Sequence, residues 1–292
     1  MIGNENSALA TGSGSGCNIV RVGEACARDS LSGAIHEACV QAGLSPQQIV
    51  RTCAGVAGAA DDGVASLVQR VLIGIVGGAI EVIGDMEIAL ESAFGGDAGV
   101  VVVAGTGAIA YGRNERGESA RAGGWGRLIS DEGSGHWVGV EAIRAALREH
   151  DRRQNPLLLR ALMQELGATD VHDLAVRANA DAMDFAKLLP VVLSAAEGND
   201  DPAIQVLERA GRELAGTAAI VVRRLFGDSD ARVAKHGGVF AASPLVTRGF
   251  EEHLRQLCPK ASCVDVEVNP VLGALQRARR GFGVWHKQEA VR

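Results

Sequence analysis

The sequence lacks the features that define several classes of protein. No run of lysine or arginine forms an extended basic patch, and the formal net charge is −6, so nucleic acid is not an expected partner. The longest mainly apolar stretch, residues 71–83, contains three glycines and is shorter than the roughly 20 residues that span a bilayer. No basic segment followed by an apolar core marks a signal peptide at the N-terminus. By elimination we expect a cytoplasmic protein that has no membrane partner.

The six cysteines lack the spacing of a metal site. No two of them form a Cys-x-x-Cys pair and no histidine cluster accompanies them, so neither a zinc site nor a cluster site is expected. Buried thiols in a reducing cytoplasm are the better interpretation.

Aromatic residues are also scarce, at 3% of the chain, whereas glycine is abundant, with 38 residues. That much glycine indicates many tight turns and close backbone approaches. The 292 residues suffice for two lobes with separate cores or for one large domain. Short apolar runs alternate with helical periodicity over residues 23–94, and residues 155–227 are predicted to be nearly all helical. Within that range Asp201 is the expected cap of a helix that opens at Pro202, and beyond it a last strand is expected at 264–268. We therefore expect an α/β protein with a parallel sheet and helical crossovers.

The strongest local signal for a binding site is a buried strand that ends in a glycine turn. Residues 99–104 form a continuous apolar run, and Gly105-Thr106-Gly107 follow it. Glycine permits backbone torsions that other residues avoid, so successive N–H groups there can converge on a phosphate oxygen, with the Thr106 hydroxyl as a further donor. A tight hairpin turn without a ligand explains the same residues equally well.

Two other strand ends carry residues of interest. Gly237-Gly238 precede a helix that opens at Ser243-Pro244, and two glycines would let an adenine ring lie against the backbone. Taken alone, these residues favour a simple strand-to-helix turn. Asp85 follows an apolar strand and precedes a helix. The favoured local role of Asp85 is a helix N-cap, and its alternative role is a general base at the carboxyl end of a parallel strand.

A fourth segment combines glycines with a tryptophan and then with acidic residues. In Gly123-Gly124-Trp125-Gly126 a large flat ring lies between residues that allow close backbone approach. This arrangement suits a sugar face, and it suits a buried core tryptophan equally. Asp131 stands just before a predicted helix, where a carboxylate also interacts favourably with the helix dipole.

The order of these segments is more specific than any one of them. The segments are Ser15-Gly16-Cys17-Asn18, Ala104-Gly105-Thr106-Gly107, Ala122-Gly123-Gly124-Trp125-Gly126, residues 130–139, Gly237-Gly238-Val239 with Ser243-Pro244, and residues 269–274. Together they resemble the N-acetylglucosamine kinase family, which is grouped with the BadF/BadG/BcrA/BcrD ATPases in the sugar kinase, actin and heat-shock-protein superfamily. The resemblance covers essentially the whole chain.

The resemblance implies a fold and an activity. The fold would be the two-lobed actin-like ATPase fold, related to ribonuclease H, with a small lobe at 1–96 plus 270–292. The large lobe would occupy 97–269 and carry a helical insertion at about 140–227. The activity would be phosphorylation of an amino sugar by ATP and Mg²⁺, with N-acetylglucosamine converted to its 6-phosphate. Glucosamine and N-acetylmuramic acid are alternative acceptors, and a homodimer is common in the family.

Site residues carry over by position. Asp85 matches the catalytic aspartate of the family. The resemblance assigns ATP phosphates to Gly105, Thr106 and Gly107, adenosine to Gly237 and Gly238, and the sugar to Asn18, Gly124, Trp125 and Asp131.

The chain also departs from the family pattern. Members begin with a strand, an Asp-Gly-Gly-Gly-Thr-like phosphate loop and a second strand, and nothing of that kind precedes Asn18, so we expect an incomplete N-terminal lobe. Ala108 stands where Ser or Thr is usual, and Lys235-His236 put charge into a normally apolar strand end. A non-catalytic protein that binds sugar or nucleotide is therefore an alternative. An ATPase that activates a dehydratase is disfavoured, because its cluster needs cysteines that the scattered ones here do not supply.

Overall fold

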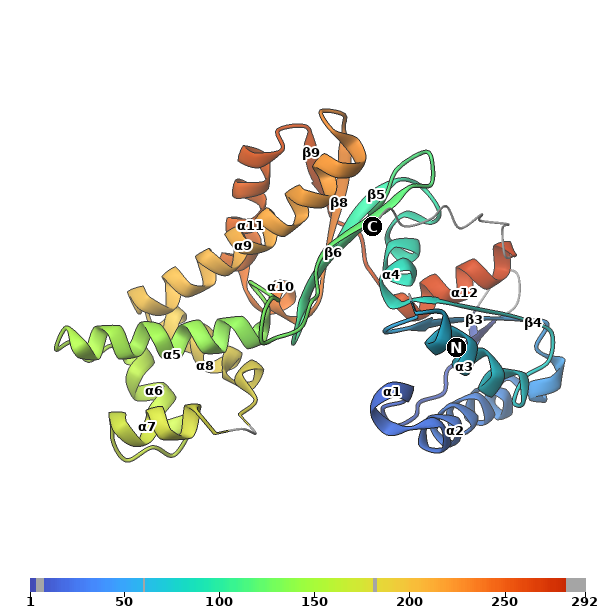
Figure 1. Cartoon of the computed structure of the whole chain (residues 1–292), viewed down its shortest axis with the longest axis horizontal. Coiled ribbons are helices and arrows are strands. Elements are labelled where there is room, and N and C mark those ends of the chain that lie inside the picture. Colours follow the sequence, from blue (N-terminus) through green and yellow to red (C-terminus); the bar gives the residue numbers. More distant parts are fainter. Residues whose placement is uncertain (4–7, 60, 181–182, 282–292) are drawn as a thin grey trace. The chain divides into compact units, whose positions relative to one another are not determined.

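A computed structural model of the chain describes residues 1–3, 8–59, 61–180 and 183–281 (Figure 1). The chain divides into two compact units, and each is described by itself. Unit 1 comprises Met1–Asp97 and the segment that begins at Glu267, and unit 2 comprises Ala98–Val266. Within the described residues, no helix is both long enough and apolar enough to span a bilayer.

Unit 2 is built on a five-stranded sheet in the order β7-β6-β5-β8-β9. The central strand β5 contains four consecutive valines, as expected for a strand that is covered on both faces. β6 and β7 follow it as antiparallel neighbours, whereas β8 and β9 run parallel to β5. The strands are β5 (Gly99–Ala104), β6 (Ala108–Arg113), β7 (Ser119–Gly123), β8 (Ala231–His236) and β9 (Ala261–Val264).

Helices make up most of the rest of unit 2. α9, with 26 residues, packs along α11 and also against β5, β6 and β7. Its regular apolar spacing and a proline in its first turn explain why the sequence forms one long helix here. The helices are α5 (Gly135–Asp151), α6 (Leu157–Glu165), α7 (Val171–Ala178), η2 (Phe185–Leu188), α8 (Leu189–Glu197), α9 (Asp201–Phe226), α10 (Gly238–Ala242) and α11 (Pro244–Leu257).

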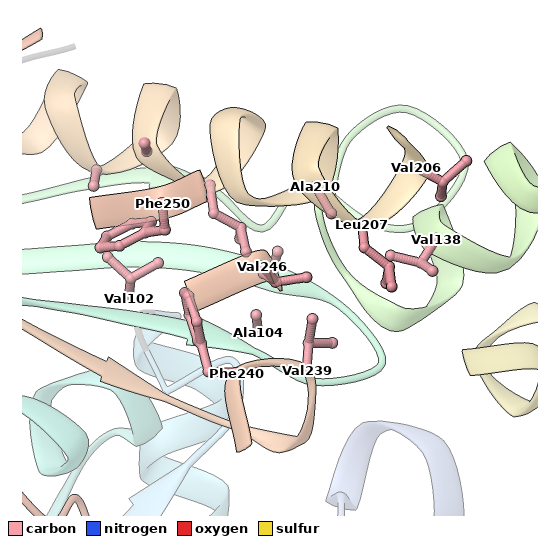
Figure 2. Packing of buried hydrophobic residues seen from close by; sticks show 14 of the residues in the cluster. Val102, Ala104, Val138, Val206, Leu207, Ala210, Val239, Phe240, Val246 and Phe250 are labelled. Carbon is pink, nitrogen blue, oxygen red and sulfur yellow. The ribbon is translucent and has the colours of Figure 1, made fainter. Parts of the chain in front are cut away.

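The core of unit 2 lies between the sheet and these helices. Figure 2 shows Val102 and Ala104 of β5 close to Phe250 and Val246 of α11. Phe250 is fully buried, and its ring meets that of Phe240 edge to face at a centroid distance of 5.3 Å. Full burial stabilises the fold by about 1.5–3 kcal/mol for each large apolar side chain. This packing fixes the carboxyl end of β5, where the glycine turn begins.

Unit 1 has smaller sheets. β1 and β2 form an antiparallel pair, and β3 and β4 form a parallel pair. Its core gathers around Val71, Leu72 and Ala27 from the helices. The elements are β1 (Ile2–Gly3), β2 (Ala8–Ala10), α1 (Ile19–Val22), α2 (Glu24–Ala42), η1 (Pro46–Gln48), β3 (Arg51–Val56), α3 (Asp62–Ile73), β4 (Ala79–Gly84), α4 (Asp85–Phe94) and α12 (Pro270–Arg280).

The two units share a pattern of strands. In unit 2 an antiparallel pair, β6 and β7, precedes a parallel pair, β8 and β9, and β5 lies between the pairs. In unit 1 the antiparallel pair β1 and β2 likewise precedes the parallel pair β3 and β4. Among the described residues of unit 1, however, no strand joins β1 to β3 as β5 joins β6 to β8. β3 is consequently less buried along its length than β5.

An ion pair and close packing hold the C-terminal helix α12 against the rest of unit 1. The Arg277 guanidinium donates to both carboxylate oxygens of Glu81 on β4, each over 2.7 Å, and Arg277 is 9% exposed. A Cβ atom on Gly273 would lie 2.6 Å from the carbonyl oxygen of Ile88, so α12 and α4 approach closely there. Two parallel hydrogen bonds from one guanidinium group to one carboxylate make a strong ion pair.

Some sequence-based expectations about elements are wrong. Asp200 rather than Asp201 caps α9, because the Asp200 side chain accepts the backbone N–H of Ala203. The strand expected at 264–268 lies instead at Ala261–Val264, where it pairs with β8. The short elements β1, β2, β7 and α1 have too weak a local pattern to be predicted.

Candidate functional site

The turn between β5 and β6 leaves two backbone amides available to a ligand. Its closing bond runs from the Gly105 N–H to the Gly107 carbonyl oxygen over 2.9 Å. Within the described residues, the N–H groups of Thr106 and Gly107 have no acceptor, and Thr106 is exposed. Adjacent free amides in a glycine turn are typical of an anion-binding nest. The turn can therefore bind a phosphate oxygen.

The carbonyl groups of the same turn are bound to the start of α5. The Gly135 N–H donates to the Gly105 carbonyl over 2.8 Å, and the His136 N–H donates to the Thr106 carbonyl over 3.3 Å. The N–H and C=O of a trans peptide unit point in opposite directions. The free amides of Thr106 and Gly107 consequently point away from α5, which leaves them open to a ligand.

Asp131 lies directly behind the turn. A Cβ atom on Gly107 would stand 2.8 Å from Asp131 Oδ2, so any larger residue there would have to displace that carboxylate. Asp131 is 7% exposed and has a φ of +70°, which residues other than glycine rarely adopt. Burial raises the pKa of Asp131, and backbone N–H groups of Ala108 and Gly126 oppose that rise. Among the described atoms Asp131 Oδ1 is buried without a hydrogen-bond partner, and a ligand hydroxyl or amide would supply one.

The second glycine turn lies beside the first. β8 runs parallel to β5, so their carboxyl ends reach the same edge of the sheet, where ligands of α/β proteins bind. Gly237 has a φ of +106°, and a Cβ atom there would stand 2.4 Å from the Ala104 carbonyl oxygen. A Cβ atom on Gly238 would meet nothing within 4 Å. Gly237 is therefore required by the backbone, and Gly238 borders open space.

Trp125 is an exposed aromatic residue and not a core residue. Its side chain is 66% exposed, and the Arg121 guanidinium lies over its ring at 4.3 Å from the centroid. Gly124 has a φ of +69° and packs against the side chain of Ile109 on β6. An exposed indole beside Gly124, which packs on β6, is suited to the apolar face of a sugar.

Asp85 and Asn18 belong to unit 1. The preferred local role of Asp85, a helix N-cap, is wrong: Gly84 is the N-cap and Asp85 is the first residue of α4. Asp85 is exposed, and its Oδ1 accepts the N–H of Met86 over 3.0 Å. Asn18 caps α1 through its side-chain oxygen, which accepts two backbone N–H groups. Among the described atoms the Asn18 amide nitrogen has no acceptor, so it is available to a ligand.

Two features of unit 2 could not be anticipated from the sequence. His136 is 8% exposed, burial lowers its pKa, and among the described atoms its Nδ1 has no partner. Its ring meets Phe185 edge to face at 5.2 Å. Lys235, whose charge was unexpected at a strand end, pairs with Glu251 of α11. Only the three-dimensional arrangement supplies these partners.

The fold is similar to that of actin-like sugar kinases. A candidate N-acetylglucosamine kinase from Chromobacterium violaceum superposes with a TM-score of 0.72 at 27% identity, over 92% of this chain and 90% of that one. A ROK family glucokinase from Streptomyces griseus, solved with glucose and AMPPNP, superposes with a TM-score of 0.53 at 15% identity, over 87% and 88%. The predicted α/β actin-like fold is thus confirmed.

The sequence assigns the family. A model of the BadF/BadG/BcrA/BcrD ATPase family matches residues 1–278. An N-acetylmuramic acid/N-acetylglucosamine kinase from Clostridium acetobutylicum is 32% identical over 256 residues, which cover 85% of this chain and 83% of the relative. The chain belongs to the BadF/BadG/BcrA/BcrD ATPase family, which confirms the predicted resemblance and implies that the protein uses ATP.

Proposed function

We propose that this protein transfers the terminal phosphoryl group of ATP to a hydroxyl of an amino sugar, with N-acetylglucosamine as the favoured acceptor and its 6-phosphate as the product. The observation that carries the proposal is the turn 105–107, whose two free amides lie at the carboxyl edge of the sheet beside Gly237 and Gly238. Family membership and relatives named as amino-sugar kinases support it. We also propose that unit 1 is the small lobe and unit 2 the large lobe.

Unit 2 would bind the nucleotide. When bound, ATP supplies the phosphoryl group and Mg²⁺ neutralises charge on its phosphates. The amides of Thr106 and Gly107 would hold phosphate oxygens, and the open space beside Gly238 would receive adenosine. Mg²⁺ needs only one or two protein carboxylates besides phosphates and waters. The proposal needs no protein cage for the ion, and the described residues contain no group of three metal-ligating side chains.

Asp85 would accept the proton of the sugar hydroxyl as that oxygen attacks phosphorus. The Asp85 carboxylate is exposed at the first position of α4, where a substrate hydroxyl can reach it. General-base help of this kind contributes about 10²–10⁴ to the rate. Most of the remaining acceleration would come from positioning and charge stabilisation.

The sugar would be held by polar and aromatic groups. The unsatisfied Asp131 Oδ1 would accept a sugar hydroxyl, and the exposed face of Trp125 with its neighbour Gly124 would pack against the ring. The Asn18 amide would donate a further hydrogen bond.

The described cysteines are all free thiols, which supports a reducing compartment such as the cytoplasm.

The test is an assay that couples ADP formation to absorbance, run with ATP, Mg²⁺ and four sugars. The sugars are N-acetylglucosamine, glucosamine, N-acetylmuramic acid and glucose as the control. We expect the highest kcat/KM for an N-acetylated sugar. Sugar and nucleotide binding without ADP formation would instead identify a non-catalytic binding protein and would refute phosphoryl transfer.

A further inference from the structure

A cavity of about 850 Å³ opens between the C-terminal half of α5 and the N-terminal end of α9, within unit 2. This volume lies in the range of small-molecule sites. The turn 105–107 is bound to the first residues of α5, and Arg148, which lines the cavity, stands about 20 Å along that helix from Gly135. The proposed phosphoryl transfer makes no use of the cavity. Four arginines line it: Arg148 from α5, Arg152 at the C-cap of that helix, and Arg209 and Arg212 from α9.

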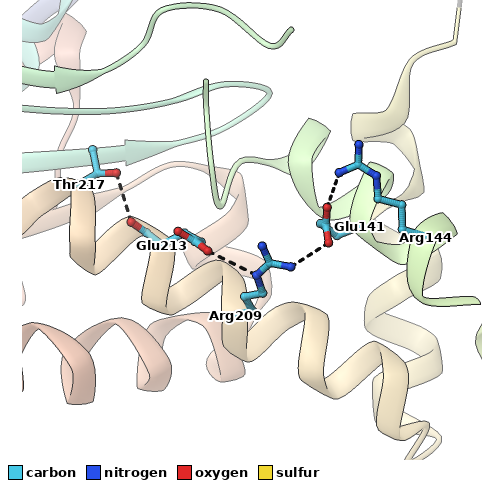
Figure 3. Close-up of polar contacts among 5 residues, drawn as sticks. All are labelled: Glu141, Arg144, Arg209, Glu213 and Thr217. Atoms are coloured by element: carbon cyan, nitrogen blue, oxygen red, sulfur yellow. Dashed lines mark hydrogen bonds and ion pairs between the residues drawn. The ribbon is translucent and has the colours of Figure 1, made fainter. Parts of the chain in front are cut away.

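Two of the acidic residues at the cavity are already paired. Glu141 is 6% exposed and accepts from Arg144 over 2.6 Å and from Arg209 over 2.9 Å, which joins α5 to α9 (Figure 3). Glu149 accepts from Arg152 over 2.7 Å. The charges of Arg152 and Arg209 are therefore balanced by carboxylates of the protein itself.

The other two acidic residues differ from each other. The Asp200 carboxylate accepts the backbone N–H groups of Leu158 and Ala203 over 3.0 and 3.1 Å. It therefore binds the N-terminal turns of α6 and α9. Asp201 is exposed, and in the described part of the chain its side chain has no partner. One carboxylate is thus available to accept hydrogen bonds from a ligand.

Two arginines remain unpaired. Arg148 and Arg212 are exposed at the cavity, and across the described residues neither has a carboxylate, carbonyl or ring partner. A guanidinium group is always charged, and its planar fork matches the oxygens of a phosphate. The four arginines and four acidic residues at the cavity balance in total charge. Among the described residues, however, two arginines and only one carboxylate are left without a protein partner.

We propose that this cavity binds a phosphorylated sugar, with the phosphate on Arg148 and Arg212 and the sugar hydroxyls on Asp201 and nearby side-chain amides. A phosphate alone would use only the arginines. The side-chain amides of Asn155, Asn199, Gln154 and Gln205 also line the cavity, and they offer the paired donors and acceptors that hydroxyl groups need.

A sugar phosphate is also the product class of the proposed function, so the cavity would sense product. This role, unlike the binding itself, rests on the proposed function. α5 is a continuous helix whose last turns line the cavity and whose first two N–H groups hold the carbonyls of the phosphate-binding turn. Occupation of the cavity would thereby bias the position of the turn and slow the enzyme.

Binding is tested by calorimetric titration of N-acetylglucosamine 6-phosphate into the full chain saturated with N-acetylglucosamine and a non-hydrolysable ATP analogue. These ligands block the turn site, so the remaining heat reports the cavity. Arg148→Ala and Arg212→Ala should each weaken binding by about tenfold or more, as expected for a lost charged hydrogen bond. Both side chains are exposed, so neither change should lower the melting temperature.

Arg255→Ala is the matched control, because Arg255 is an exposed arginine of α11 in unit 2 that does not line the cavity. It should bind as the wild type does. Absence of binding, or equal weakening in all three variants, would overturn the proposal. Inorganic phosphate that binds as tightly as the sugar phosphate would overturn the assignment to a sugar. Because the titration needs no turnover, a failure of phosphoryl transfer leaves its outcome unaffected.

Discussion

The backbone N–H of Gly135 donates to the carbonyl oxygen of Gly105 over 2.8 Å, and this bond ties the first turn of α5 to the glycine turn after β5. This bond occupies the Gly105 carbonyl group and leaves the backbone N–H on the opposite side of that peptide unit available to a ligand. The geometry of the proposed phosphate site therefore depends on a helix 30 residues further along the chain, and not on the turn alone.

The two glycines after β8 should differ in what they tolerate. Gly237→Ala places a Cβ atom 2.4 Å from the Ala104 carbonyl oxygen at a φ of +106°, so we expect it to lower the free energy of unfolding by about 1–3 kcal/mol. Gly238→Ala is the control, because its Cβ atom would meet open space within a helix. Urea denaturation of both variants checks this. Equal stability of the two would show that the strain at Gly237 is absent.

Stability should depend on pH through Asp131. Burial raises its pKa above the ordinary 3.8, so the folded state binds a proton more readily than the unfolded state. The free energy of unfolding should therefore fall as the pH rises from 3.8 through the raised pKa. Asp131→Asn removes this dependence, and asparagine tolerates the positive φ of the site.

The measurement is urea denaturation of wild type and Asp131→Asn at several values between about pH 4 and pH 7. The exposed Glu115 of unit 2, which is not among the groups that shift the pKa of Asp131, supplies the control, and Glu115→Gln should keep the slope of the wild type. If the difference in free energy of unfolding between Asp131→Asn and wild type stays constant over this pH range, the pKa of Asp131 is not raised in the folded state.

The thiols should react at very different rates. Burial and the neighbouring Glu81 carboxylate raise the pKa of Cys53 to about 12, so it carries almost no thiolate at pH 8. Cys17 and Cys26 are exposed. We expect a maleimide to modify these two within minutes and to leave Cys53 unmodified until urea unfolds the chain, as mass spectrometry of peptides would show. Modification of Cys53 in the folded protein at the rate of Cys17 contradicts this account.

Parts of the fold follow directly from local sequence. The four valines of β5 and the glycines at 105 and 107 specify a buried strand and a tight turn, because both signals lie within one short segment. The apolar spacing of α9 is equally local. Its cap could not be chosen by sequence, because Asp200 and Asp201 have the same chemistry and only the position of the Ala203 N–H separates them.

The rest depends on partners that are far apart in sequence. β7 is a five-residue strand whose register with β6 comes from the sheet and not from its own residues. The burial of Asp131 behind Gly107, and the bond between Gly135 and Gly105, arise only when α5 folds onto the turn. The sequence thus predicts which residues belong to the candidate site, and that prediction still stands to be tested. The environment that shifts the pKa of Asp131 comes from tertiary structure.

The most direct test of phosphoryl transfer compares wild type with Asp85→Asn by mass spectrometry of the sugar product and by calorimetry of sugar binding. Asp85 is exposed at the start of α4, so its replacement should preserve folding and N-acetylglucosamine affinity. The rate of formation of the sugar 6-phosphate should fall by about 10²–10⁴. Asp29→Asn, at an exposed carboxylate of α2 in the same unit, should leave the rate unchanged. Formation of the 6-phosphate by Asp85→Asn at the wild-type rate would contradict the account.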